Sequence, residues 1–250
     1  MRKDEVRDLR VMTNLRTSHA RVVDQLGLAI VGGRFEIGEP LPGDSELESQ
    51  FDVSRSVLRE AMKTLTAKGL VVAKSRVGTR VTDRCHWNLI DEEVLRWHFK
   101  AGVTREFIDF LYDVRLVFEP ASAAYAALRA TPEDCAELRR YANLLGAEDL
   151  DWQGQVEADL RFHVLLTLAG ANPFLESMIG FLKAALDGAF TLAFDPKLAG
   201  RGETIIETHM AIVEAIENKD ADAARAATEK VVQLGRKMAL KAVDASTNRT

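Results

Sequence analysis

The sequence predicts a mainly α-helical protein in two parts: three helices with a β-hairpin, then a bundle made of helices alone. Two observations support this division. Apolar residues recur at helical spacing over most of the 250 residues. Two short runs, 70–73 and 79–82, are instead rich in residues that favour strands, and they flank a turn at Val77-Gly78. From Glu92 onward the helical spacing continues without a strand pattern.

The first part opens with a segment, 1–17, that we expect to form a flexible or weakly helical arm. Helical spacing becomes clear near His19 and stops at Gly32-Gly33. The apolar face of this predicted helix is formed by Val22, Val23, Leu26 and Ile30. The stretch 38–43 is too rich in Gly and Pro to continue as a helix.

Two short helices are predicted next, over 45–51 and 54–68, with only Asp52-Val53 between them. Gly69 ends the second helix in the manner of a C′ glycine, and the two strands follow. This order of helices, tight turn and hairpin is that of a winged helix-turn-helix, which we assign to residues 18–84.

The second part is predicted to be an all-α helical bundle. We interpret 85–102 as a linker and the first helix of this bundle, and 103–245 as its main body. Helix breaks are marked by Gly102, Thr131-Pro132, Gly170 to Pro173, Asp195 to Gly202 and Asn218 to Asp220. These breaks leave about six helices.

Composition excludes several classes of protein. The chain is 47% hydrophobic and 28% charged, as in ordinary globular domains, and no apolar run approaches the roughly 20 residues of a membrane span. The charged N-terminus is unlike a secretion signal, so we expect a cytoplasmic protein. Cys85 and Cys135 lack metal-type spacing; two reduced thiols are favoured over one disulfide.

The net charge of −5 is unevenly distributed along the chain. It divides into +3 for residues 1–85 and −8 for the rest, which suits a protein in which one domain faces an anionic partner.

The predicted helix 54–68 carries basic residues on one face. Arg55, Arg59 and Lys63 lie four residues apart, opposite an apolar face, and Ser54 is placed to cap the helix. A basic stripe alone is equally typical of a solvated surface helix. Here it lies on the second helix of a helix-turn-helix and precedes a basic hairpin, which favours contact with double-stranded DNA. The residues predicted to bind DNA are Arg55, Ser56, Arg59, Lys63, Arg76, Gly78 and Arg80.

These motifs resemble the GntR superfamily. The resemblance is carried by Pro40-Leu41-Pro42, by Val53-Ser54-Arg55-Ser56-Val57-Leu58-Arg59-Glu60-Ala61 and by Gly78-Thr79-Arg80-Val81. The second part resembles the FCD domain of the FadR-like branch, with its markers at Arg115 and Glu119, Asp159 and His163, Asn172-Pro173 and His209. The string Trp87-Asn88-Leu89-Ile90-Asp91, continuing to Trp97, further resembles repressors of sugar-acid catabolism of the galactonate type.

The resemblance implies a homodimeric repressor that releases operator DNA when a small carboxylate, such as a sugar acid, binds its second domain. It also implies one divalent metal, zinc or similar, held by Asp159, His163 and His209. A further histidine that many FCD domains supply is replaced by Val231 here, which would leave an open coordination position.

Each predicted pocket residue also has a plain structural explanation. Asp159 and His163 lie four apart on a predicted helix, 156–169, and either could simply serve the fold. Without a metal, the same residues and His209 could hydrogen-bond a sugar acid directly. Arg115 interrupts an apolar stretch formed by Phe110, Leu111, Val114, Val117 and Phe118. Its anionic partner is either Glu119, one turn on, or the carboxylate of the effector.

Two other functions fit the sequence less well. A metalloenzyme built on Asp159, His163 and His209 is disfavoured, because the sequence has no HExxH, no GxSxG and no evident general base. A protein whose helical part only dimerises would not need a buried Arg115 beside a polar cluster. The sequence therefore favours a ligand-controlled, DNA-binding regulator that is not an enzyme.

Overall fold

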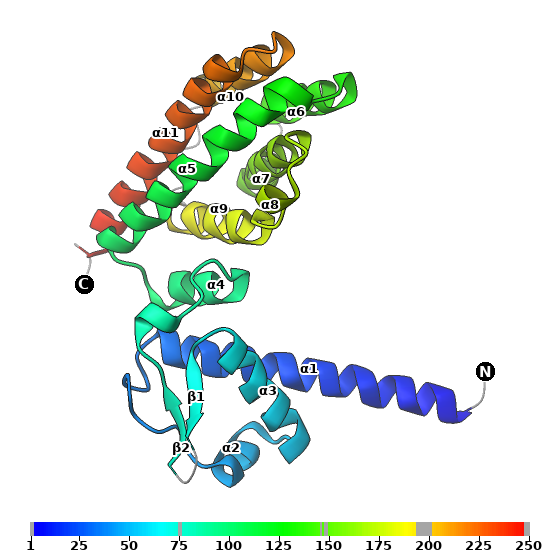
Figure 1. Ribbon diagram of the computed structural model, residues 1–250, viewed down its shortest axis with the longest axis vertical. Helices are drawn as coiled ribbons and strands as arrows, with labels where there is room; N and C mark the ends of the chain where they lie inside the picture. The colour runs from blue at the N-terminus through cyan, green and yellow to red at the C-terminus, as the bar shows by residue number, and fades with distance from the viewer. Residues whose placement is uncertain (1–2, 75–76, 146, 148–149, 194–201, 248–250) are drawn as a thin grey trace. The chain divides into compact units, whose positions relative to one another are not determined.

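A computed structural model of the chain describes residues 3–74, 77–145, 147, 150–193 and 202–247 (Figure 1). The chain divides into two compact units, Met1–Gly102 and Val103–Thr250. The structure is mainly α, with one two-stranded sheet among the described residues, as the sequence predicts.

The first unit has the predicted order of a winged helix-turn-helix. Its elements are α1 (Lys3–Val31), α2 (Asp44–Phe51), α3 (Arg55–Ala67), β1 (Val71–Lys74), β2 (Gly78–Val81), the one-turn 3-10 helix η1 (Arg84–His86) and α4 (Glu92–Ala101). The strands pair antiparallel, with Val71 opposite Val81 and Lys74 opposite Gly78. Gly69 is required between α3 and β1: its φ is +79°, and a Cβ there would lie 1.9 Å from the carbonyl oxygen of His86.

The N-terminal segment is helical, which is one of the two alternatives expected for it. α1 begins at Lys3 and runs without a break to Val31. The sequence from Lys3 to Leu26 contains neither Gly nor Pro, so nothing in it ends the helix that the apolar residues after His19 define.

α4 also differs from its predicted place. We expected this helix to be the first of the all-α bundle, but it packs on α1 and belongs to the first unit. Val94 and Trp97 are buried in the core of that unit. The indole of Trp97 lies against Gly27, where a Cβ would come within 2.4 Å of the ring, and its Nε1 donates to Asp24 at 2.7 Å. The missing side chain at Gly27 is therefore what admits Trp97.

The second unit is a helical bundle. It contains α5 (Arg105–Arg129), α6 (Pro132–Leu144), α7 (Trp152–Ala169), α8 (Pro173–Glu176), α9 (Ile179–Ala193), α10 (Gly202–Glu217) and α11 (Ala221–Thr247). The described residues thus form seven helices from α5 onward, one of them the single turn α8. Most of the predicted break from Asp195 to Gly202 lies outside the described residues.

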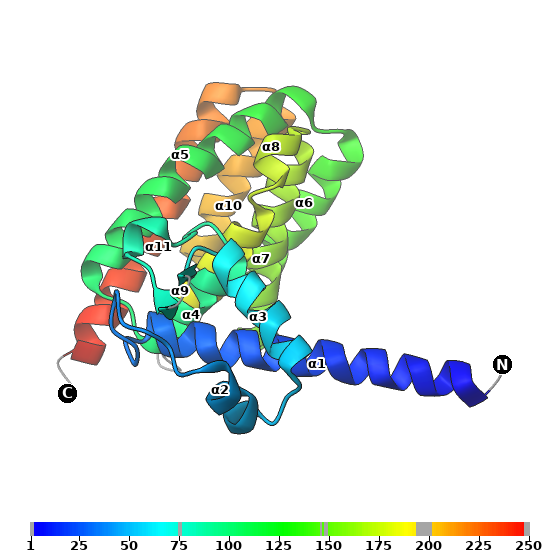
Figure 2. The ribbon, with the colours of Figure 1, turned by 60° about the horizontal axis from the view of Figure 1, so that its bottom comes forward.

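α5 and α11 are the long helices of the bundle and lie side by side (Figures 1 and 2). Arg236 on α11 ties them together with ion pairs to Asp109 at 2.7 Å and Asp113 at 3.0 Å. Gly235 allows close approach, because a Cβ there would lie 3.2 Å from the hydroxyl of Tyr112 on α5. No helix in the described ranges is long and apolar enough to cross a membrane.

Candidate functional site

The first candidate site is the outer surface of α3. Asp52 makes the tight turn after α2 with a φ of +48°, and the Ser54 hydroxyl accepts a hydrogen bond from the Val57 amide at 3.4 Å, as the capping prediction requires. The inner face of α3 is buried through Val57, Leu58, Ala61 and Leu65. The first turn of α3 therefore faces solvent, and the N-terminal end of an exposed helix suits a phosphate.

The predicted recognition residues of α3 lie together on this outer face. Arg55, Ser56, Arg59 and Lys63 are all exposed. Lys63 forms an ion pair with Glu60 at 2.8 Å, and this contact lowers the pKa of the Glu60 carboxyl. Part of the positive charge of the stripe is thus neutralised within the helix, and most of the remaining positive charge of this face is on Arg55 and Arg59.

The hairpin holds the remaining predicted DNA residues. Gly78 adopts a φ of +91° at the start of β2, and, apart from Gly78 and its two chain neighbours, no atom of the described residues lies within 4 Å of the place where its side chain would be. Arg80 is half-buried and donates to the carbonyl of Gly38 at 2.5 Å, so part of its guanidinium fastens the hairpin to the preceding loop. Arg76 lies outside the described residues.

Two anchors of this surface were not predicted. Arg21 on α1 donates to the carbonyl of Phe51 at the end of α2, at 2.7 Å, and His19 contacts the Thr64 hydroxyl on α3 at 3.1 Å. Both residues precede or flank the apolar face of α1. A single polar residue at such a place does not change the hydrophobic periodicity of the helix, so periodicity does not reveal its contacts. They fix the angle at which α2 and α3 meet α1.

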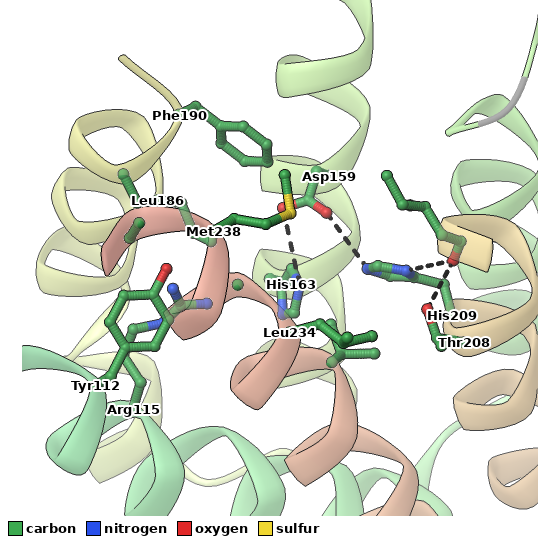
Figure 3. A pocket seen from close by; sticks show the side chains of 15 residues that line it. Tyr112, Arg115, Asp159, His163, Leu186, Phe190, Thr208, His209, Leu234 and Met238 are labelled. Carbon is green, nitrogen blue, oxygen red and sulfur yellow. Dashed lines mark hydrogen bonds and ion pairs between the residues drawn. The ribbon is translucent and has the colours of Figure 1, made fainter. Parts of the chain in front are cut away.

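The second candidate site lies in the second unit, where three polar side chains are buried together. Asp159 and His163 come from α7 and His209 from α10, and each is at most 7% exposed (Figure 3). One possible ligand atom from each of the three lies within 4.8 Å of the others. The structure therefore brings together the predicted metal set from two separate helices.

In His163 and in His209 it is Nε2 that faces the carboxylate of Asp159. The Nε2 of His209 lies 3.3 Å from Oδ1 of Asp159, and the Nε2 of His163 lies 3.8 Å from Oδ2 (Figure 3). The Nδ1 of His209 is 2.8 Å from the carbonyl of Ile205. A carbonyl can only accept, so this Nδ1 donates and leaves a lone pair on Nε2 of the neutral ring.

His163 is held from behind by a carboxylate. Its Nδ1 lies 2.9 Å from Oε2 of Glu119, although the ring N–H points off that oxygen and the contact is electrostatic rather than a directed hydrogen bond. Glu119 is in turn bound by Arg115, with Nε to Oε1 at 2.5 Å. Glu119 is therefore the partner of Arg115 within the chain, which is one of the two alternatives that the sequence left open. Arg115 also lines the cavity, so a carboxylate there would meet its positive charge.

The protonation equilibria follow from this arrangement. Burial raises the pKa of Glu119, but the charges of Arg115 and His163 outweigh it and hold the pKa at about 2. Burial also raises the pKa of Asp159, but the interactions of its carboxylate with His163 and His209 outweigh this effect and lower the pKa. Burial disfavours the charge on His163, yet the two carboxylates around it raise its pKa. The pocket thus contains permanent negative charge facing two imidazoles.

The three residues fit a divalent metal. The His209 Nε2 is buried and makes no hydrogen bond, although it faces the Asp159 carboxylate. A tetrahedral site with bonds of about 2.0–2.1 Å has its ligand atoms roughly 3.3 Å apart. The Nε2 of His209 lies 3.3 Å from Oδ1 of Asp159, and one ligand atom from each of the three residues lies within 4.8 Å of the others, so the side chains need to close only slightly around an ion. The acceptors behind both Nδ1 atoms are the outer contacts that metal-binding histidines generally make.

The cavity over this cluster has a volume of about 100 Å³. That is room for an ion and a few heavy atoms of a ligand. The cavity is lined by Tyr112, Arg115, Asp159, His163, Leu186, Ala189, Phe190, Ile205, Thr208, His209, Val231, Leu234, Gly235, Met238 and Ala239. Val231, which the resemblance to FCD domains places where many of them have a histidine, is a buried residue of this wall.

Sequence reasoning missed several members of the site. Tyr112 was detectable, because it lies three residues before Arg115 on the same helical face, and its ring lies 4.6 Å under the guanidinium carbon. The role of Glu119 behind His163 and the place of Thr208 depend on how α5 and α10 pack against α7. No spacing within one helix reveals such contacts.

Comparison with known proteins identifies a family for each of the two parts of the chain. Residues 19–81 match the gntR family of bacterial regulatory proteins, and residues 110–234 match the FCD domain. The chain is 34% identical to the uncharacterized HTH-type transcriptional regulator YieP of Escherichia coli, over 85% of this chain and 91% of YieP. It is also 34% identical to the galactonate operon transcriptional repressor of E. coli, over 83% of this chain and 90% of the repressor.

Solved structures show the same fold. Lar, which controls expression of the agr system of Listeria monocytogenes, superposes with a TM-score of 0.59 over 89% of this chain and 96% of its own, at 20% sequence identity. Because two domain families match in the order predicted, and full-length relatives share a third of the residues, the family is settled. The chain belongs to the GntR family of bacterial transcription regulators, in the FadR-like branch with an FCD domain, and not to a class of enzymes.

Proposed function

We propose that this protein is a transcription repressor that leaves its operator when a small carboxylate binds at a divalent metal on Asp159, His163 and His209. The observation that supports this most strongly is the buried Nε2 of His209, which faces Asp159 without a hydrogen bond. A buried polar atom left unsatisfied costs about 1–3 kcal/mol, so a ligand that uses its lone pair stabilises the folded state.

A metal held by three protein ligands keeps a coordination position open and would supply a positive centre for a ligand's carboxylate and hydroxyl groups. The chain's own residues then orient the ligand. Arg115 offers a second positive charge at the wall, and the hydroxyls of Tyr112 and Thr208 offer hydrogen bonds. Val231 keeps the remaining side apolar.

The proposed effector class is a sugar acid of the galactonate type. A 34%-identical relative is a galactonate operon repressor, which supports this choice. The pocket chemistry itself requires a carboxylate with an adjacent hydroxyl or keto oxygen. Simpler 2-hydroxy acids therefore belong in the same panel as a comparison.

The DNA contacts are proposed to come from α3 and the hairpin. Arg55, Ser56, Arg59 and Lys63 would enter the major groove, while Gly78 and Arg80, together with Arg76, would contact the adjacent backbone or the minor groove. A homodimer places two such heads on half-sites about 34 Å apart, and effector binding favours a dimer geometry that no longer matches that spacing. Such a repressor acts on the chromosome, in the cytoplasm.

The test combines metal content, melting temperature and DNA release. DNA fragments selected from a random pool provide the operator, and the readout is their release by aldonic, uronic and 2-keto-3-deoxy sugar acids and by simple 2-hydroxy acids. We expect close to one divalent ion per chain in the parent, loss of the ion and of effector response in His163→Ala, and operator binding retained. His86→Ala is the matched control, because His86 is exposed in the first unit.

A metal-free alternative gives a different pattern. If the parent contains no ion and restored metal has no effect, yet His163→Ala and Arg115→Ala both abolish the response, the residues bind the acid directly by hydrogen bonds. If both variants release DNA normally, the pocket is not the effector site.

A further inference from the structure

The wall of the cavity over Asp159, His163 and His209 reaches the surface at Leu234 on α11. Leu234 lines the cavity and is 39% exposed, whereas the other lining residues are more deeply buried (Figure 3). A second groove lies outside, over α10 and α11, and it is lined by the same Leu234 and by Thr208, which also lines the cavity. At these two side chains, the wall between the buried cluster and the outer groove is a single layer.

The outer groove carries positive charge in a unit that is acidic as a whole. Residues 103–250 contain 16 Lys and Arg against 23 Asp and Glu, a net charge of −7. Lys230 and Lys237 line the groove, together with a single carboxylate, that of Glu229. Lys241 continues the row, because positions 230, 234, 237 and 241 are three or four residues apart on one face of α11.

These lysines have no task within the fold. Lys230, Lys237 and Lys241 are exposed, and none of them forms an ion pair with another residue that the structure describes. Exposed lysines alone are ordinary on a solvated helix. Here two of them border the side chain that closes the cavity, and the cavity behind it is lined by Arg115. A carboxylate therefore meets positive charge both outside and inside Leu234.

We propose that the outer groove is the entrance through which a small carboxylate reaches the buried cluster. Lys230 and Lys237 attract the anion, and a change of rotamer at Leu234 opens the wall. Partly exposed side chains change rotamer rapidly, so the helix itself does not need to move. This inference rests on the proposed function, in which the cavity binds an acid, and it names the route that the acid takes.

The proposal has a kinetic consequence. A unit charge about 10 Å away in water changes the local concentration of an anion about twofold at low salt, so two lysines change it about fourfold. Salt near about 1 M screens this attraction. The two lysines should therefore accelerate the entry of a carboxylate at low salt and leave the entry of a neutral molecule unchanged.

Alkylation of His209 can record what enters the cavity, without a metal or an effector. In metal-free Cys85→Ser, Cys135→Ser protein, the Nε2 that makes no hydrogen bond attacks the methylene carbon of bromoacetate. The N–C bond forms, bromide leaves, and the ring loses its Nδ1 proton to solvent. Bromoacetamide reacts by the same step but is neutral. Peptide mass spectrometry measures the rate at His209 for each reagent.

The charge test compares two double variants in this background. In Lys230→Gln, Lys237→Gln we expect the bromoacetate rate to fall about 3–5-fold at low salt, the bromoacetamide rate to stay the same, and the difference to vanish in about 1 M salt. Lys183→Gln, Lys219→Gln is the matched control, because it removes two exposed lysines of the same unit outside the groove. An unchanged bromoacetate rate in the groove variant, or an equal fall in the control, would overturn the proposal.

The second test changes Leu234 itself. Leu234→Ala should accelerate both reagents about fivefold or more, and Leu234→Trp should slow both, which a mere loss of stability would not do. Leu168→Ala is the matched control, because Leu168 is 44% exposed on α7 and does not line the cavity. Equal rates in the parent and both Leu234 variants, or no alkylation in the parent or in Leu234→Ala, would place the entrance elsewhere and overturn the proposal.

Failure here is distinguishable from failure of the proposed function. If the variants change alkylation as expected but no acid releases DNA, the proposed function is wrong and the entrance stands. If an acid releases DNA from the parent but neither pair of variants alters alkylation, only the entrance is wrong.

Discussion

Nδ1 of His163 lies 2.9 Å from Oε2 of Glu119, and the opposite nitrogen of the same ring faces Asp159 at 3.8 Å. The ring therefore connects a buried Arg115–Glu119 ion pair to the proposed metal position. This relation assigns Glu119 the role of a positioning residue, because its negative charge behind Nδ1 favours the orientation in which Nε2 of His163 faces Asp159.

Glu119→Gln should weaken zinc affinity about 10–100-fold, as the loss of such outer contacts generally does. The variant also leaves the Arg115 charge buried without its partner, which costs about 3–5 kcal/mol of stability. Isothermal titration of zinc into metal-free protein measures the affinity.

The double variant Arg115→Met, Glu119→Gln separates the two effects. It removes both charges, so stability should largely recover while zinc affinity stays low. Parental affinity in this folded double variant would show that Glu119 does not orient His163.

Arg59→Ala should weaken operator binding by about 1–3 kcal/mol if Arg59 contacts a base, and should relax preference at one position of the selected DNA. Its side chain is exposed on the outer face of α3, so stability should not change. A gel-shift titration checks this, with Arg140→Ala on the surface of α6 as control. Equal affinity of Arg59→Ala and the parent would contradict the assignment of α3 as the recognition helix.

Gly27→Ala should destabilise the first unit by about 1–3 kcal/mol or more, because the added methyl would lie 2.4 Å from the ring of Trp97. Urea unfolding measures the effect. Gly43→Ala is the matched control, since no atom lies within 4 Å of its Cβ position. If both variants were equally stable, α4 would not be docked on α1 through Trp97.

The buried imidazole of His98 should make the stability of the first unit depend on pH. Burial, with a smaller contribution from the charge of Arg84, lowers its pKa from 6.5 to about 4. As the pH falls through 6.5 the unfolded chain takes up the proton first, so stability is lost between pH 6.5 and 4. Allowing for partial exposure, we expect a loss of about 1–2 kcal/mol.

The measurement compares urea unfolding of the parent and His98→Gln at pH 7 and pH 4.5. The parent should lose more stability than the variant, whereas exposed His86→Gln should behave as the parent. Equal losses in the parent and His98→Gln would mean that His98 titrates normally.

The first unit was predictable because its signals are local. The cap at Ser54, the turn at Asp52-Val53 and the glycine at Gly69 each define an element end within a few residues. The place of α4 was not predictable in this way, because Trp97 of α4 packs where Gly27 has no side chain, and Gly27 lies seventy residues earlier in the chain. A glycine within a helix does not show which distant residue packs against it.

The candidate site was predictable only as a set of residue types. The i, i+4 spacing of Asp159 and His163 and the resemblance to FCD domains identified the candidate ligands, which the structure brings together. Which face of α5 is buried could not be read from its sequence, because the helix is apolar on both faces. Packing against α11 turned Arg115 inward and left Val117 outward.

A single metal on Asp159, His163 and His209 is proposed to couple the pocket to DNA release. This coupling is tested most directly by an effector titration of the protein–operator complex with zinc-loaded protein, with metal-free protein, and with metal-free protein to which zinc is restored. We expect release in the first, loss of release in the second and full recovery in the third, with no recovery in His209→Ala. Equal release by the loaded and metal-free parent would contradict it.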